Sequence, residues 1–381
     1  MKLLRIVLIN LLVVFVLLEG GMRIYYEVTQ KAPPHSDHSV VREWRWVMTR
    51  LADGKVNFDG RFVHDELAGW KNAPNIDRVV EHHGSIRTNA QGMRNDRDFS
   101  LEADDGRPRL MIVGDSYSFG HGISNEQTYA YQLASMMPDW DIMNLAVSAT
   151  GTDQNYIMYE QYGEKFSPSI VILGFYLLNF NRNTFSFRDS AKPMYVPQAD
   201  GSLLLTHSPV ISPEELINEY KSGNRKIGGW HYSYAFAAFQ KVFTTYTKRN
   251  RSEGSLPRRT LTGIMEKFAE RVRANGATPV WVIFPIRDIL EKDESKYEVI
   301  GEFAEAEARR LGMGVINLDP VFRNYLQANP KVETLWRPRE IGGHLSELGN
   351  KVTAQAIYDF LLQQELIERT TTADASAVEN M

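Results

Sequence analysis

Residues 107–120, RPRLMIVGDSYSFG, contain the pattern that decides the fold. An apolar run over residues 109–113 ends at Gly114, and Ser116 follows immediately after Asp115. A short apolar run that stops at a glycine is typical of a buried parallel strand that turns into a helix. Open α/β sheets place their active sites at the carboxyl ends of such strands. Ser116 is therefore the first candidate functional residue.

Segments with strand-like and helix-like patterns continue to alternate through the rest of the chain. Alternation of this kind predicts an α/β fold with a doubly wound, flavodoxin-like parallel sheet of about five strands, covered on both faces by helices. The further apolar runs that predict strands occupy residues 141–145, 170–175, 279–284 and 314–318. The segments with helical spacing occupy residues 127–137, 260–274, 297–311 and 353–366.

The N-terminus carries an apolar segment. Lys2 and Arg5 precede residues 6–18, which are apolar except for Asn10. This pattern predicts a membrane anchor or signal segment over residues 1–23, because a full span needs ~20 apolar residues and a signal core fewer. The basic end would stay in the cytoplasm, which predicts an inner-membrane protein with its catalytic domain in the periplasm. A cleaved signal, giving a secreted or periplasmic protein, and a buried core helix are the alternatives.

The remaining chain divides by composition into three parts. Residues 24–105 are mixed and polar and predict an extension that packs on the main domain. Residues 106–368 form that domain, interrupted at 184–259 by an aromatic-rich insertion that fits the strand–helix rhythm poorly. Residues 369–381 are small and polar and predict a disordered tail.

Charge and cysteine content exclude several classes of protein. The net charge of −4 argues against a nucleic-acid binder. The absence of cysteine excludes disulfides, cysteine-ligated zinc and a thiol nucleophile. No phosphate-binding glycine loop and no cluster of metal ligands occurs, so we expect neither a cofactor nor a metal.

Four short motifs follow predicted strands or precede a predicted helix. They are GDSYSFG at 114–120, NLAVSATG at 144–151, GFYLLN at 174–179 and GGHLSELGN at 342–350. His344 in the last motif lies between two glycines and a helix, a setting that is unusual for a core histidine.

Taken together, these motifs resemble the four blocks of the SGNH (GDSL-like) hydrolase family, which contribute Ser, Gly, Asn and His in that order. The resemblance covers residues 60–365 apart from the insertion. It is closest to the bacterial membrane-anchored or exported branch that is related to polysaccharide O-acetyl-modifying enzymes. The stretches HDELAGW at 64–70 and TNAQGMR at 88–94 also resemble that branch.

The resemblance implies a role for each matching residue. Ser116 would attack an ester carbonyl, and His344 would accept its proton. The backbone N–H of Ser116, a backbone N–H at Ala149 or Gly151, and the Asn179 side chain would form the oxyanion hole. A hydroxyl nucleophile needs such a base, and the tetrahedral anion needs such donors.

The sequence departs from the family at two places. Ala149 stands where the family has glycine. The family's usual acid lies two or three residues before the histidine, and Gly342 and Ile341 occupy those positions here. We expect Glu340 to orient His344, with a backbone-supported dyad or Asp319 as alternatives. Asp115 is expected to support the turn at the nucleophile.

The expected function is that of a serine esterase or O-acyltransferase acting on acyl groups, acetyl above all, of a cell-surface carbohydrate. Polysaccharide-assembly proteins are expected as partners. The alternatives are an inactive SGNH-like module in exopolysaccharide assembly and a lipid-ester hydrolase. Surface cations that could hold an anionic sugar are Arg94, Arg182 and Arg337 beside Trp336, and His121 is a candidate for the pocket lining.

Overall fold

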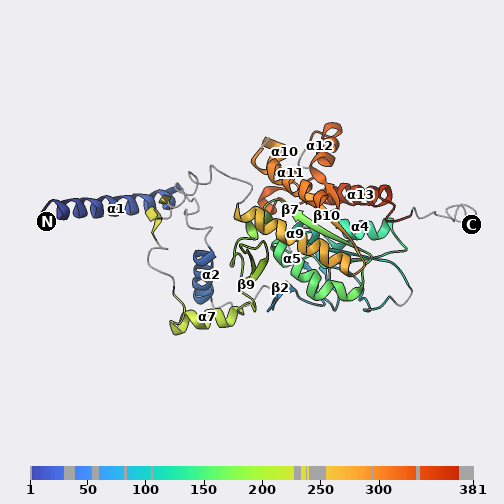
Figure 1. Cartoon of the computed structure of the whole chain (residues 1–381), viewed down its shortest axis with the longest axis horizontal. Coiled ribbons are helices and arrows are strands. Elements are labelled where there is room, and N and C mark those ends of the chain that lie inside the picture. Colours follow the sequence, from blue (N-terminus) through green and yellow to red (C-terminus); the bar gives the residue numbers. More distant parts are fainter. Residues whose placement is uncertain are drawn as a thin grey trace, which may run out of the picture.

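A single parallel sheet forms the centre of the main domain (Figure 1). The computed structural model describes residues 2–29, 39–53, 60–80, 84–103, 106–226, 233–236, 238–239, 255–292, 295–331 and 335–368. The five strands run in the order β11-β10-β7-β5-β6, which is the flavodoxin-like order, and the predicted fold class is confirmed. The strands are β5 (Arg109–Gly114), β6 (Asp141–Asn144), β7 (Ile170–Tyr176), β10 (Thr278–Phe284) and β11 (Gly314–Asn317).

The sheet residues are mostly apolar, as expected for strands whose two faces are both covered. β5, β6 and β7 are buried along their whole length. One layer of helices consists of α4 (Tyr129–Met136), α12 (Leu318–Ala328) and α13 (Glu347–Gln363). The other consists of α5 (Thr152–Met158), α9 (Leu256–Ala274) and α11 (Ser295–Arg310).

The helix boundaries differ from the predicted ones where capping residues set them. α13 begins at Glu347 rather than 353, because the Ser346 side chain accepts a hydrogen bond from the Gly349 N–H and caps the helix. α9 begins at Leu256, with a proline in its first turn, so the insertion ends earlier than predicted.

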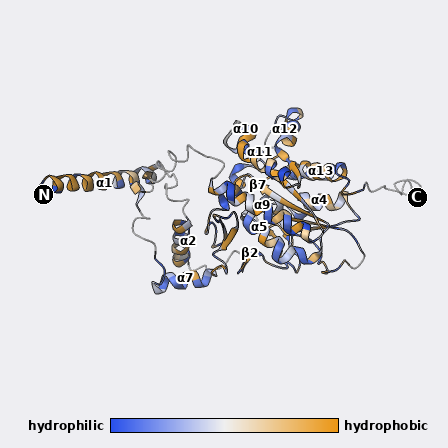
Figure 2. Cartoon of the chain, in the orientation of Figure 1, coloured by the Kyte–Doolittle hydropathy of each residue, from blue (hydrophilic) through white to orange (hydrophobic). Residues whose placement is uncertain are grey.

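The N-terminal apolar segment forms α1 (Lys2–Thr29), which projects away from the domain and is hydrophobic along its first half (Figure 2). Its most apolar 18-residue window has a mean hydropathy of 2.4 and is 0% buried. A buried core helix is therefore the wrong interpretation. Length and composition suit either a membrane span or a signal sequence.

The extension contains a helix that the sequence reading missed, α2 (Ser39–Asp53). Its buried Val47 packs with Phe187 and Leu216 of the insertion in a separate apolar cluster. The extension also carries two antiparallel strand pairs, β1 (Phe62–Asp65) with β2 (Gly69–Asn72) and β3 (Asp77–Val80) with β4 (Gly84–Arg87).

The insertion has some regular structure of its own. It contains the pair β8 (Met194–Pro197) and β9 (Leu203–Thr206), followed by α7 (Pro213–Ser222). The predicted disordered tail, residues 369–381, lies outside the described residues. The shorter helices of the main domain are α3 (Ser116–Phe119), α6 (Asn179–Arg182) and α10 (Arg287–Lys292).

Candidate active site

Ser116 is the first residue of α3 and lies directly beyond the carboxyl end of β5. Asp115 caps this helix, since its carboxylate accepts the Tyr117 N–H at 2.9 Å. The turn is tight: a Cβ at Gly114 would lie 2.3 Å from Ser118 Oγ, and one at Gly174 only 2.0 Å from the same atom. Glycine at both positions therefore lets α3 approach the sheet closely.

His344 meets Ser116 across the end of the sheet. Its Nε2 lies 2.9 Å from Ser116 Oγ, although the two residues are 228 positions apart in the chain. The histidine loop is fixed by a bridge between Trp336 and Leu345 and by the Arg337 N–H, which donates to the His344 carbonyl at 2.8 Å. This is the geometry in which an imidazole can take a proton from a hydroxyl.

Two aromatic side chains flank the imidazole. The His121 ring lies 4.6 Å from the His344 ring, measured between centroids, and the Tyr117 ring lies 5.4 Å away. The structure therefore places His121 beside the imidazole, but His121 is not among the residues that line the cavity over Ser116, contrary to the expectation from the sequence.

The structure distinguishes the two backbone donors proposed after β6. The Gly151 N–H is already engaged, because it donates to Gln154 Oε1 at 3.0 Å as the cap of α5. In the part of the chain that the structure describes, no hydrogen bond uses the N–H of Ser116 or of Ala149. The expectation for Gly151 is therefore corrected, and Ala149 is the remaining donor in this loop.

Ala149 has a left-handed backbone, with φ of 69°. This conformation explains why a glycine is expected there, since a Cβ in it costs ~1–2 kcal/mol. Arg188 holds the peptide in place by donating from Nη1 to the Ala149 carbonyl at 3.0 Å.

We expect Ala149→Gly to raise the free energy of unfolding by about 0.5–1 kcal/mol. Relief of the left-handed strain exceeds the entropy that the more flexible unfolded chain gains. The midpoint of urea unfolding measures the change. Ala146→Gly in the same loop is the control, because Ala146 is fully buried and has no positive φ, and it should destabilise the protein. An unchanged or lower midpoint for Ala149→Gly would contradict the strain argument.

A polar network holds Asn179 at the end of β7. Arg182 Nη1 donates to Asn179 Oδ1 at 2.8 Å, so the amide oxygen faces the guanidinium. The amide nitrogen then faces Asp115 and donates to its Oδ2 at 3.1 Å, which leaves one further N–H on Asn179. Only the i,i+3 spacing of Asn179 and Arg182 on one helix could have pointed to this network from the sequence.

Burial raises the pKa of the Asp115 carboxyl above its usual range, and the Arg182 guanidinium opposes that shift. Arg182 Nη1 lies 3.1 Å from Asp115 Oδ2. Asp115 thus joins the turn at Ser116 to α6 as well as capping α3.

The structure does not connect the expected acids to His344. Glu340 is exposed, and no hydrogen bond joins it to His344 among the described residues. Asp319 pairs instead with Arg323 at 2.8 Å. A Cβ at position 342 would lie 3.4 Å from His344 Nδ1, but Gly342 has φ of 108°, a conformation that disfavours aspartate.

A cavity of about 400 Å³ opens over the serine and histidine. No group of three or more His, Asp or Glu side chains that could hold a metal ion occurs among the described residues. The cavity is lined by aromatic, aliphatic, charged and glycine residues together with the serine and histidine. They are Ser116, Tyr117, Tyr176, Leu178, Arg182, Ile286, Arg287, Asp288, Tyr297, Arg339, Gly342, Gly343 and His344.

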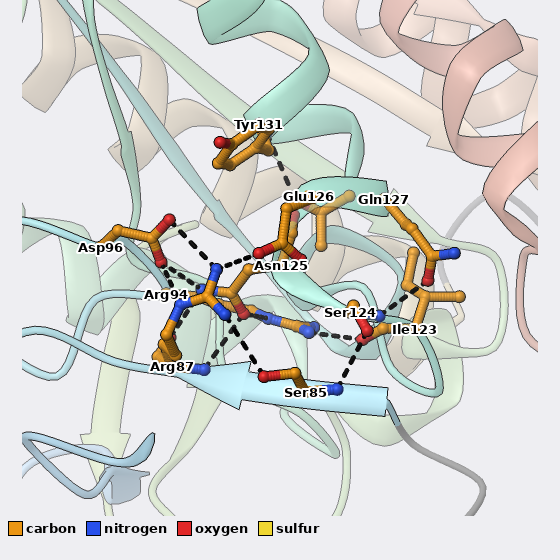
Figure 3. Close-up of polar contacts among 11 residues, drawn as sticks. Ser85, Arg87, Arg94, Asp96, Ile123, Ser124, Asn125, Glu126, Gln127 and Tyr131 are labelled. Carbon is orange, nitrogen blue, oxygen red and sulfur yellow. Dashed lines mark hydrogen bonds and ion pairs between the residues drawn. The ribbon is translucent and has the colours of Figure 1, made fainter. Parts of the chain in front are cut away.

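Two residues singled out as possible sugar ligands are structural. Arg94 is only 4% exposed and donates to the carbonyls of Phe119 and Gly120 at 2.7 and 2.6 Å. It also donates to the Ile123 carbonyl at 2.5 Å, and Figure 3 shows Arg94 beside Ile123. Arg94 therefore supports the segment that follows α3. Trp336 is fully buried against Phe322.

Comparison with known proteins gives likenesses of fold. No protein-family model matches the chain. No curated protein matches it either. The chain is similar to the solved structure of TesA, with 12% sequence identity, coverage of 67% of this chain and 98% of that one, and a TM-score of 0.39. It is also similar to LAE5, an α/β hydrolase from the metagenome of Lake Arreo, Spain, with 12% identity, coverage of 66% of this chain and 94% of that one, and a TM-score of 0.39. A variant of Axe2, an acetylxylan esterase from Geobacillus stearothermophilus, is similar with 10% identity, coverage of 67% of this chain and 94% of that one, and a TM-score of 0.40.

Proposed function

We propose that the chain is a serine ester hydrolase or O-acyltransferase of the SGNH type. The observation that carries the proposal is the 2.9 Å contact between Ser116 Oγ and His344 Nε2 at the carboxyl edge of the sheet. A nucleophile and base at this distance, beside unused backbone N–H groups, suit acyl transfer.

The reaction would proceed in two half-reactions. His344 takes the proton as Ser116 Oγ bonds to the ester carbonyl carbon. The N–H groups of Ser116 and Ala149 and the remaining N–H of Asn179 stabilise the oxyanion. The bond to the alcohol oxygen then breaks, His344 returns its proton to that oxygen, and acyl-Ser116 remains. Water or a sugar hydroxyl then gives its proton to His344 and attacks the acyl carbon. The bond between that carbon and Ser116 Oγ breaks, His344 returns the proton to Ser116 Oγ, and the free acid or the new sugar ester leaves.

The proposed substrate is an acetyl ester of a cell-surface carbohydrate. The rings of Tyr176 and Tyr297 and the guanidinium of Arg182 line the cavity, a combination that suits the apolar faces and hydroxyls of a sugar. The apolar helix α1 supports a location at the membrane, where such glycans are assembled. Comparing acetyl-ester hydrolysis with and without oligosaccharide acceptors separates an esterase from a transferase.

Covalent labelling tests the proposal directly. A fluorophosphonate probe should label the wild-type protein, and digestion should place the adduct on the peptide that contains Ser116. Absence of labelling in folded protein would leave the second candidate, a non-catalytic module of the same fold. The departure at Gly342 and the full burial of Asn179 favour that candidate.

We expect Asn179→Ala to lower kcat by about 10²–10³ while changing KM little, because its amide is needed mainly when charge develops on the carbonyl oxygen. Steady-state kinetics on an acetyl ester measure both constants. The matched control is Asn181→Ala on the same helix, whose exposed side chain should be dispensable. A loss confined to KM would argue against a role in the oxyanion hole.

Residues from about 30 onward should face the periplasm, because Lys2 and Arg5 flank the apolar segment on its N-terminal side. A reporter fused after Leu366 that is active only outside the cytoplasm checks this. Activity only in the cytoplasm would contradict the proposed topology, and a mature chain that begins after Gly21 would replace the anchor with a cleaved signal.

A further inference from the structure

The aromatic-rich insertion contacts the end of the apolar helix α1. The Ser233 hydroxyl and the Ala235 N–H both donate to Glu19 Oε2, each at 2.9 Å. Arg23, one turn further along α1, lies over the Tyr234 ring at 4.7 Å from its centroid. In Figure 1 this yellow segment lies beside the end of α1 nearer the domain.

The contact occupies one face of the helix. Among the α1 side chains whose exposure is described, only Glu19 and Met22 are not fully exposed. Together with Arg23 they are spaced i, i+3 and i+4, so they share a face. Glu19 also pairs with Arg23 at 2.7 Å, which orients both side chains toward the insertion. A carboxylate that accepts a backbone N–H at the start of a helical turn is a favourable cap.

The position of Glu19 along α1 determines where this contact would lie relative to a membrane. It follows directly after the apolar run at 6–18, whose side chains are exposed to between 45% and 69%. If α1 spans a bilayer, the short apolar run thins the hydrocarbon layer locally, and Glu19 lies near its outer boundary with the lipid headgroups. The docked residues 233–236, 238 and 239 then lie near the same level.

The docked segment presents aromatic side chains. Phe236 is 36% exposed and Phe239 is 66% exposed, and their i,i+3 spacing places them on one side of the turn. The surrounding sequence combines further aromatic residues with cations, namely Trp230, Tyr232, Tyr246, Lys241, Lys248 and Arg249. This composition is typical of segments that lie in the headgroup layer.

We propose that residues 233–236, 238 and 239 form a second membrane contact, a lipid-facing foot that is docked on α1 through Glu19 and Arg23. The proposal rests on the retention of α1 that forms part of the proposed function. The same insertion is joined to α2, because Arg225 pairs with Glu43 at 2.6 Å. Through these contacts the foot would hold the catalytic domain at a fixed height above the bilayer rather than on a single tether.

Single labels can locate the foot, because the chain has no cysteine. Phe239→Cys and the control Val299→Cys, which replaces a side chain 48% exposed on α11, are each labelled with an environment-sensitive fluorophore in the full-length protein. The proteins are reconstituted in phosphatidylcholine–phosphatidylglycerol vesicles. We expect a blue-shifted emission at 239 and at least about twofold stronger quenching by lipids spin-labelled near the headgroup. The label at 299 should be quenched by aqueous iodide.

Removing the Glu19 contacts with Ser233 and Ala235 should separate the foot from α1. Glu19→Ala in the Phe239→Cys protein should reduce lipid quenching toward the level at 299, whereas Glu270→Ala, at an exposed position on α9, should not. Thermal unfolding of each variant confirms that the domain remains folded.

Three results would overturn the proposal. They are iodide access at 239 equal to that at 299, a shielded label at 239 that lipid quenchers do not reach, and a mature protein that lacks Glu19. The second result would indicate a protein partner instead. None of these measurements depends on Ser116, so failure of the foot and failure of the proposed chemistry are distinguishable.

Discussion

Replacing Ser116 with alanine should lower kcat by a factor on the order of 10⁶ on any ester that the protein cleaves. The Ser116 hydroxyl lies within hydrogen-bond distance of His344 Nε2, at 2.9 Å. Without it no acyl-enzyme can form, and only the oxyanion donors and substrate binding remain. Initial rates on an acetyl ester, together with loss of fluorophosphonate labelling, measure the effect.

The fold should tolerate this change. The substitution removes one oxygen at the edge of a cavity and leaves the cap of α3 on Asp115 intact. Ser118→Ala is the matched control, because Ser118 lies on the same helix but is fully buried beside Gly114 and Gly174. Equal activity of the wild type and Ser116→Ala would end the enzyme interpretation built on this serine.

Replacing His344 with alanine should be nearly as damaging, because a serine hydroxyl is a weak nucleophile without a base. Residues that act as a unit give similar single losses, so we expect a loss within about tenfold of that for Ser116→Ala. The double variant should lose little more than either single variant. Additive losses would instead mean that the two residues act independently.

Glu340→Gln is the informative companion to this variant. Glu340 is exposed and makes no hydrogen bond to His344 in the described structure, so we expect activity within about threefold of the wild type. A loss of about 10²-fold or more would instead show that Glu340 moves to the imidazole during catalysis and fixes its tautomer. Either result is read against His344→Ala, which should have no measurable turnover.

Local patterns in the sequence were enough to predict the sheet. Each strand is a short, continuous apolar run, and such runs are easy to recognise because a parallel strand is buried on both faces. Ser116, Asn179 and His344 were found for the same reason, since each lies close to a strand or helix boundary that the local pattern marks. Helix α2 was not predicted, because its apolar face is buried only through contact with Phe187 of the insertion, which is distant in the sequence.

The assignment of donors and ligands depended on the tertiary structure. From the sequence alone, Ala149 and Gly151 are equally good candidates for the backbone donor of the oxyanion hole. In the structure, the Gly151 N–H already donates to the Gln154 side chain. Arg94 looks like a surface cation until its three carbonyl acceptors are seen to come from the nucleophile loop.

The sequence by itself therefore predicted the sheet and the candidate residues at its carboxyl edge, because burial and helix capping depend on residues that are close together in the chain. The tertiary structure alone decided which N–H groups remain available and that the insertion docks on Glu19. Hydrogen bonds between distant segments decide these points, and they depend on where the folded backbone brings a donor to an acceptor.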